Sequence, residues 1–170
     1  MSISSELVAR YKTDVFIETG SYEGGTIQKA LDAGVKEIHS IEINPQKFKF
    51  CCARFANEPR VNLYLGDTID ILPEIINKLS QRATFWLDAH AGNGASGRYS
   101  CPLIQELKAF ISSPIKDHII LIDDRRLLGS AAWGRVTEEQ VLAELKSVNS
   151  NYTIVYEDGV VPNDIIVATL

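Results

Sequence analysis

Short apolar segments alternate with longer stretches of mixed apolar and polar residues along most of the 170-residue chain. Apolar runs bounded by turn residues predict buried strands, and apolar residues at helical spacing predict the helices that cover them. The predicted strands are residues 14–18, 37–43, 61–65, 83–88, 118–123, 152–157 and 164–170. The predicted helices are residues 25–33, 45–57, 68–79, 102–112 and 137–148. Such alternation is typical of a parallel sheet with helices on both faces.

Residues at the ends of the predicted helices support these boundaries. Gly34 suits the left-handed position that follows a helix, and Asn44 before Pro45 suits the start of one. The segment 137–140, which reads TEEQ, is a capping box. Pro73 lies inside a predicted helix, and we expect it to break the first turn.

Only residues 158–163 separate the last two predicted strands. A crossover between parallel strands needs roughly a dozen residues or more, so these two strands must be antiparallel neighbours. The sequence therefore predicts an α/β fold with a doubly wound, mostly parallel, seven-stranded sheet and an antiparallel final strand. Since no linker or repeat divides the chain, we expect residues 1–170 to form one domain.

Composition narrows the class of protein. Hydrophobic residues make up 45% of the chain and charged residues 23%, as in globular domains. A net charge of -5 without a basic block argues against a nucleic-acid partner. The three cysteines, Cys51, Cys52 and Cys101, suit neither a disulfide framework nor a zinc site. With no leader and no apolar run long enough for a bilayer, we expect a cytoplasmic protein without a membrane partner.

A glycine-rich turn follows the first predicted strand, where residues 18–26 read ETGSYEGGT. Glycine lets a backbone approach a ligand closely, and open α/β sheets bind ligands at the carboxyl ends of their strands. The spacing G-x-x-x-G-G is a poor match to the nicotinamide dinucleotide motif. The alternatives are a tight turn without a ligand and Glu18 as an acid beside a helix start.

Acids also lie at the ends of the next two predicted strands. Glu42 is placed to accept hydrogen bonds from ribose hydroxyls, and Asp67 is placed to receive an adenine amino group. Glu42 suits NAD and other adenosine ligands equally, and taken alone it is more often a surface acid. Three successive strand ends of this kind favour a nucleotide-like ligand.

Asp88 ends the fourth predicted strand, and Asp123 and Asp124 end the fifth. Acids after apolar strands are costly unless a cation or a solvated cleft accompanies them. Three converging carboxylates suit Mg²⁺. The alternatives are that Asp88 only holds a cofactor, and that Asp123 and Asp124 cap the next element or pair with Arg125 and Arg126.

The ordered set Glu18-Thr19-Gly20, Gly24-Gly25, Glu42, Gly66-Asp67 and Asp88 resembles the class I S-adenosylmethionine-dependent methyltransferases, over residues 14–170. The resemblance implies a Rossmann-like fold and S-adenosylmethionine as cofactor, with Gly20 at the methionine part, Glu42 at the ribose and Asp67 at the adenine. The implied cofactor-binding residues are Glu18, Gly20, Ser21, Tyr22, Gly24, Gly25, Thr26, Glu42, Asp67, Thr68 and Asp88. Tyr22 stands where many members have glycine, and we expect it to cover the ligand or narrow the pocket.

The acids Asp88, Asp123 and Asp124 are similar to a trio in the divalent-metal-dependent small-molecule O-methyltransferases. Sugar-modifying members carry a metal ligand and a base one residue apart, and here the second position is His90. The resemblance implies that His90 and Asp88 are catalytic, with His90 as general base, and that Asp88, Asp123 and Asp124 bind Mg²⁺. It implies methyl transfer to a small-molecule acceptor, at an oxygen.

Two other functions stay open: a metal-dependent hydrolase or transferase on the same sheet, and a non-catalytic binding module with this fold. His90 could instead be a structural hydrogen-bonding group. Residues 91–99 are either a lid or a surface loop. Trp133 either stacks on a substrate or packs a loop on the core, whereas Trp86 is expected in the core. The sequence leaves a homodimer open.

Overall fold

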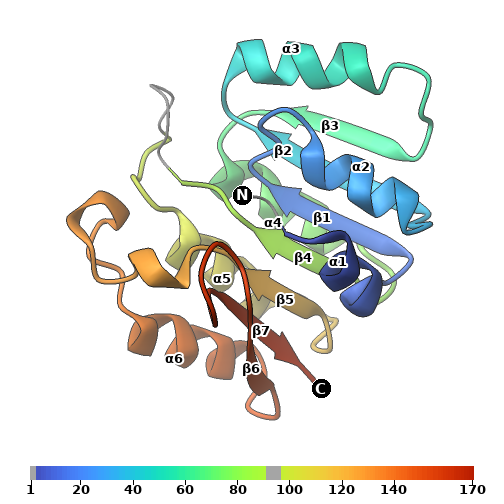
Figure 1. The fold of residues 1–170 in the computed structure, drawn as a ribbon. Helices are drawn as coiled ribbons and strands as arrows, with labels where there is room; N and C mark the ends of the chain where they lie inside the picture. Colours follow the sequence, from blue (N-terminus) through green and yellow to red (C-terminus); the bar gives the residue numbers. More distant parts are fainter. Residues whose placement is uncertain (1–2, 91–96) are drawn as a thin grey trace.

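The computed structural model describes residues 3–90 and 97–170, which form a seven-stranded sheet flanked by helices (Figure 1). The strands are β1 (Val15–Thr19), β2 (Glu37–Glu42), β3 (Val61–Leu65), β4 (Thr84–Leu87), β5 (Ile119–Ile122), β6 (Thr153–Glu157) and β7 (Ile165–Thr169). They lie in the order β3-β2-β1-β4-β5-β7-β6, and β7 is antiparallel to both of its neighbours. The predicted fold class is confirmed.

The helices are α1 (Ser5–Tyr11), α2 (Gly25–Asp32), α3 (Pro45–Arg54), α4 (Thr68–Lys78), α5 (Leu103–Ala109) and α6 (Glu138–Val148). Short 3-10 helices cover Phe110–Ser112, Arg125–Leu127 and Ala131–Trp133. The sequence analysis missed α1, a short helix that Ser4 caps by accepting a hydrogen bond from the N–H of Leu7. Within the described residues, no helix has the length and apolar character needed to cross a membrane.

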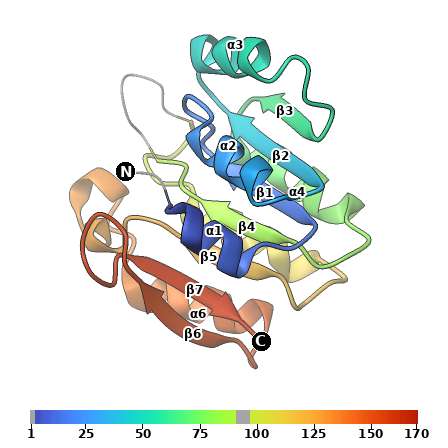
Figure 2. The same ribbon diagram turned by 45° about the vertical axis from the view of Figure 1, so that its right-hand side comes forward.

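The two C-terminal strands pair as predicted, but the final strand does not form the edge of the sheet. β7 lies between β5 and β6, so that Val167 pairs with Leu121 on one side and with Val155 on the other. β6 is therefore the edge strand. This order places the β6–β7 hairpin beside the segment that follows β5 (Figure 2).

Two hydrophobic cores cover the two faces of the sheet. One core includes Phe85 of β4 with residues of α4, α5 and α6, and the other includes Trp86 with residues of α1, α2 and α3. Figure 2 shows α1 and α2 in front of the sheet and α4 and α6 behind it. Because both faces are covered, the central strands are apolar at consecutive positions. The prediction that Trp86 is a core residue is confirmed, since its side chain is fully buried.

Local capping confirms the helix boundaries at three places. Gly34 has a φ of +80°, and the N–H groups of Gly34 and Val35 close α2 by donating to the carbonyls of Leu31 and Ala30. The Asn44 side chain caps α3. The capping box that begins α6 is also present.

Pro73 does not break α4, so that prediction is wrong. The helix continues from Thr68 to Lys78 with Pro73 inside it. Proline cannot donate the usual backbone hydrogen bond, here to Ile69, which costs a helix stability. Leu72 and Ile76 are fully buried against the sheet, and their packing keeps the helix in one piece. The other predicted elements begin and end within three residues of the observed ones.

His118, which precedes β5, is a neutral buried side chain. It is 0% exposed, and its Nδ1 accepts a hydrogen bond from the N–H of Ala83 at 3.1 Å. Burial lowers the pKa of His118 from 6.5 to about 4. Between pH 6.5 and pH 4, His118 binds a proton in the unfolded chain but stays neutral in the folded protein, so the free energy of unfolding falls as pH falls.

We expect the free energy of unfolding to lose on the order of 3 kcal/mol from His118 as pH decreases from 6.5 to 4. Urea unfolding at several pH values measures this loss. The matched variant is His118→Asn, whose side-chain oxygen can accept the Ala83 hydrogen bond but does not titrate. It should show a shallower pH dependence than the wild type, and identical slopes would contradict the assignment.

Candidate functional site

A cavity of about 660 Å³ opens at the carboxyl ends of the central strands. It lies where the strand order reverses, since the chain runs from β1 outward to β3 and then returns to β4 on the other side of β1. Open α/β sheets bind ligands at such switch points. All the predicted site residues except Gly24 line this cavity.

Two glycines of the turn after β1 are required by its backbone. Gly20 has a φ of +87°, and a Cβ at this position would lie 2.9 Å from the carbonyl oxygen of Asp88. Gly24 has a φ of +76°, and its Cβ would lie 2.5 Å from the ring of Phe55. Gly24 therefore shapes the turn from outside the cavity. At Gly25, which lines the cavity, a Cβ would meet nothing within 4 Å.

Glu18 is a buried acid in the cavity wall. Its Oε2 accepts a hydrogen bond from the hydroxyl of Ser40 at 2.6 Å, and that hydroxyl lies 2.5 Å from the hydroxyl of Ser21. Burial is the main reason why the pKa of Glu18 is raised to about 8. Burial thus favours the protonated carboxyl group, whereas a cation beside it would favour the ionised form.

Glu42 holds together the two loops that border the cavity. One carboxylate oxygen accepts the N–H of Tyr22 at 2.8 Å and the other accepts the N–H of Asn44 at 2.7 Å. Each oxygen can accept a further hydrogen bond. Tyr22 has a φ of +48° and a side chain 54% exposed, with the Lys47 ammonium 4.0 Å from its ring centre. An aromatic side chain thus stands at the cavity rim.

Asp67 lies at the start of α4, opposite the segment that follows residue 96. It accepts a hydrogen bond from the N–H of Ile69 as helix cap and another from the N–H of Arg98 at 3.0 Å. Thr68 beside it also lines the cavity. Of the predicted loop 91–99, residues 91–96 lie outside the described residues.

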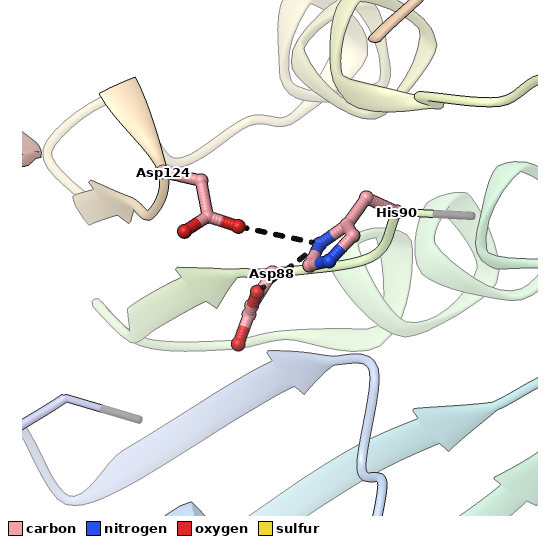
Figure 3. Close-up of side chains that lie close together, drawn as sticks. All are labelled: Asp88, His90 and Asp124. Carbon is pink, nitrogen blue, oxygen red and sulfur yellow. Dashed lines mark ion pairs between the residues drawn. The ribbon is translucent and has the colours of Figure 1, made fainter. Parts of the chain in front are cut away.

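His90 and two acids meet at the other end of the cavity (Figure 3). The Nδ1 atom of His90 lies 3.4 Å from a carboxylate oxygen of Asp88 and 3.6 Å from one of Asp124. The contact with Asp88 is the main cause of the raised pKa of His90, while burial raises the pKa of Asp88. Since Nδ1 faces the acids, Nε2 is the nitrogen left to act on a ligand.

Trp133 packs against His90 and not as an exposed platform for a ligand. The indole is 4% exposed, and the two ring centres are 5.4 Å apart with their planes tilted by 32°. Of the two predicted roles for Trp133, packing into the core is the one that its burial supports.

The three predicted metal ligands are divided between two groups of donor atoms. Asp88 and Asp124 share one group with His90, whereas Asp123 and Asp124 share another with Asp164; within each group the donor atoms lie within 4.8 Å of one another. An oxygen of Asp123 accepts the N–H of Asp124 at 2.8 Å. Burial raises the pKa of Asp123 to about 7.

Arg126 forms ion pairs with the acids at this end of the cavity. Pairing of Asp124 with this arginine was one of the alternatives that the sequence left open. The Nη1 atom of Arg126 lies 2.7 Å from an oxygen of Asp124 and also contacts Asp164. Arg125, by contrast, pairs with Glu138 at 2.9 Å.

The carboxylates offer oxygen ligands that suit Mg²⁺, and the imidazole of His90 adds a nitrogen ligand that suits Mn²⁺ or Zn²⁺ better.

The sequence analysis did not identify three buried residues near this site, Asp164, Ser40 and Glu106. Asp164 and Ser40 are buried, and Glu106 of α5 is 1% exposed with its pKa raised by burial to about 7. Glu106 and Asp164 are acids at positions otherwise expected to be apolar, which is a signal that could have found them. Ser40 carries no such signal because a serine inside a strand is common.

No family model matches the chain. A segment of 73 residues, 43% of the chain, is 27% identical to ribosomal RNA small subunit methyltransferase A of Prochlorococcus marinus (strain MIT 9312). The same enzyme of strain AS9601 is also 27% identical over 73 residues. These matches span about a quarter of the length of the two relatives, 26% and 27%.

Solved structures resemble the whole chain. A Clostridium thermocellum protein named as an rRNA methylase has a TM-score of 0.70 at 12% identity, with 99% of both chains covered. The O-methyltransferase TomG of Streptomyces achromogenes, in complex with S-adenosylmethionine, has a TM-score of 0.63 at 15% identity and covers 99% of this chain and 81% of its own. An O-methyltransferase of Bacillus cereus gives 0.65 at 11%, with 99% and 83% covered. The chain has the fold of the class I S-adenosylmethionine-dependent methyltransferases.

The close approach of Gly20 to β4 is testable by comparison with Gly129. Both residues have positive φ, but a Cβ at Gly129 would meet nothing within 4 Å. Gly129→Ala should cost about 1 kcal/mol of unfolding free energy from its backbone conformation alone. Gly20→Ala should cost about 3 kcal/mol, because the end of β4 must also shift. Equal costs in urea unfolding would show that the backbone contact is unimportant.

Proposed function

We propose that this chain binds S-adenosylmethionine and transfers its methyl group to an oxygen of a small-molecule acceptor. The observation that carries the proposal is one continuous cavity with nucleotide-type acids at one end and a His90–acid group at the other. The fold shared with methyltransferases supports it. Neither the cofactor nor the acceptor follows from the fold alone.

The turn after β1 and the acids of β1 and β2 would hold the cofactor. Gly20, Ser21 and Gly25 border the space for its amino-acid part, and Glu18 would pair with the ammonium group there. Glu42 would accept hydrogen bonds from the ribose hydroxyls. Each of its carboxylate oxygens already accepts one backbone hydrogen bond and has a further lone pair for a second. Asp67 would accept the adenine amino group.

The His90 end of the cavity would bind the acceptor. Bound S-adenosylmethionine would supply a methyl group already activated on a sulfonium, so the protein's task is chiefly alignment. His90 would hold its Nδ1 proton toward Asp88 and Asp124, and its Nε2 would take the proton from the acceptor hydroxyl. The ring contact with Trp133 limits the freedom of the imidazole, which is itself partly exposed.

Of the predicted Mg²⁺ ligands Asp88, Asp123 and Asp124, Asp88 and Asp124 would hold a divalent cation together, because they share one group of donor atoms, whereas Asp123 belongs to the other group. When bound, the cation would lower the pKa of the acceptor hydroxyl. His90 is close enough to Asp88 and Asp124 to contribute a nitrogen to the same ion. If His90 bound the ion through Nδ1, its proton would lie on Nε2, so the imidazole would serve either as a ligand or as the base that takes the acceptor proton.

Ribosomal RNA is a second candidate acceptor, because the two curated relatives are named as ribosomal RNA methyltransferases. RNA binding requires cations that face the phosphates. Among the described residues, three cations line the cavity: Lys47 is paired with Glu23, Arg126 is paired with Asp124 and Asp164, and Arg54 donates a hydrogen bond to the carbonyl of Glu23. These pairings and the net charge of -5 favour a small molecule.

The cofactor assignment predicts that S-adenosylhomocysteine binds the wild type in calorimetric titrations, whereas NAD and ATP do not. Glu42→Ala should weaken this binding roughly tenfold or more, because hydrogen bonds to the ribose are lost. The control is Glu37→Ala, which removes an exposed acid at the other end of β2. Unchanged affinity in Glu42→Ala would contradict the ribose assignment, and binding of NAD or ATP instead would overturn the proposed function.

The acceptor assignment predicts that methyl transfer needs His90. In assays with labelled S-adenosylmethionine and a panel of catechols and hydroxylated sugars, His90→Gln should lower kcat about 100-fold and leave S-adenosylhomocysteine affinity within about twofold. The matched control is His39→Gln, since His39 pairs with Tyr64 outside the cavity lining. Full turnover in His90→Gln would exclude the base role. Transfer to RNA alone would favour the second candidate.

A further inference from the structure

Asp164, at the start of β7, is an acid buried in the protein far along the chain from the cavity residues. It is 1% exposed. Its side chain accepts hydrogen bonds from the N–H groups of Arg126 and Val160, each at 3.1 Å, and its carbonyl accepts the N–H of Arg125 at 2.8 Å. The β6–β7 hairpin is thereby fastened to the 3-10 helix that follows β5.

The guanidinium of Arg126 connects Asp164 to the cavity. The same Nη1 atom contacts an oxygen of Asp164 and lies 2.7 Å from Oδ1 of Asp124. A guanidinium held by one buried carboxylate has little freedom to move, so it fixes the second carboxylate as well. Arg126 thus bridges the hairpin and the acid beside His90.

Asp124 needs the contact with Arg126 because its backbone has an unfavourable conformation. It has a φ of +59°, a left-handed conformation that costs free energy for a residue other than glycine. Its N–H donates to Asp123, and its carbonyl accepts the N–H of Leu127 at 2.8 Å. While Oδ1 faces Arg126, Oδ2 lies 3.6 Å from Nδ1 of His90 (Figure 3).

We propose that Asp164 and Arg126 are positioning residues, which fix the carboxylate of Asp124 so that its free oxygen orients the imidazole of His90. The inference rests on the proposed function, in which His90 acts on the acceptor. It makes the C-terminal hairpin part of the reaction end of the cavity, although no residue of the hairpin lines that cavity in the described part of the chain.

The test compares Asp164→Asn and Arg126→Gln with the matched control Arg125→Gln. Asparagine keeps an oxygen for one of the two backbone N–H groups, those of Arg126 and Val160, which bind different oxygens of Asp164, and it removes the charge that holds Arg126. Arg126 is partly exposed, with 30% of its side chain accessible, so its variant should fold even if Asp164→Asn does not. Arg125 has the same side chain one position earlier; it pairs with Glu138 and donates to the carbonyl of Asn163, so its variant loosens the hairpin without removing the guanidinium that contacts Asp124.

The first measurement is the imidazole nitrogen NMR signals of the free protein at one fixed pH. The chain has three histidines, and the His90→Gln variant assigns the His90 signals. Asp164→Asn and Arg126→Gln should both shift them, and Arg125→Gln should not. In an Asp124→Asn background, Arg126→Gln should produce no further shift, because the effect passes through Asp124.

The second measurement is catalysis with the acceptor found in the catechol and sugar panel. Both positioning variants should lower kcat about tenfold or more through misplacement of His90, with S-adenosylhomocysteine affinity within about twofold of the wild type. Unshifted His90 signals in Arg126→Gln would overturn the inference, as would an equal shift in the Asp124→Asn background. If the wild type transfers no methyl group, the proposed function fails, while the NMR comparison still decides the positioning roles.

Discussion

The turn after β1 is packed directly on the end of β4, and the rest of the site depends on this contact. A side chain at residue 20 would collide with the carbonyl oxygen of Asp88, so the two strand ends can meet only if glycine stands there. Their meeting places the turn, which borders the end of the cavity proposed for the cofactor, next to Asp88, which borders the end proposed for the acceptor. A shift at this contact would therefore alter both ends together.

Buried acids are the second feature that the fold must accommodate. Glu18, Asp88, Glu106 and Asp123 all have pKa values raised by burial. Such groups reduce the stability of the folded state unless a hydrogen bond, a cation or a ligand offsets the loss of hydration. Their concentration around one cavity is typical of sites in which binding, and not stability, has set the choice of residues.

The C-terminal hairpin joins a distant part of the chain to this cavity. A sheet whose final strand were at the edge would leave residue 164 remote from β5. The insertion of β7 between β5 and β6 brings Asp164 against Arg126 and so against the acid that faces His90. The antiparallel strand therefore does more than complete the sheet, because it anchors the segment between β5 and α6.

Apart from α1, the order of elements followed from the sequence by itself, and all the predicted site residues except Gly24 line the cavity, because apolar periodicity, helix caps and acids at strand ends are local signals. The short 158–163 connection likewise determined that β6 and β7 are antiparallel. Tertiary structure alone decided the rest. Packing against the sheet keeps α4 continuous through Pro73. Gly24 faces the ring of Phe55, and Trp133 packs against His90. It also decided which acids pair with the guanidinium of Arg126, since the folded hairpin brings Asp164 to the same side chain that contacts Asp124. These outcomes depend on contacts between residues far apart in the chain, which no local pattern records.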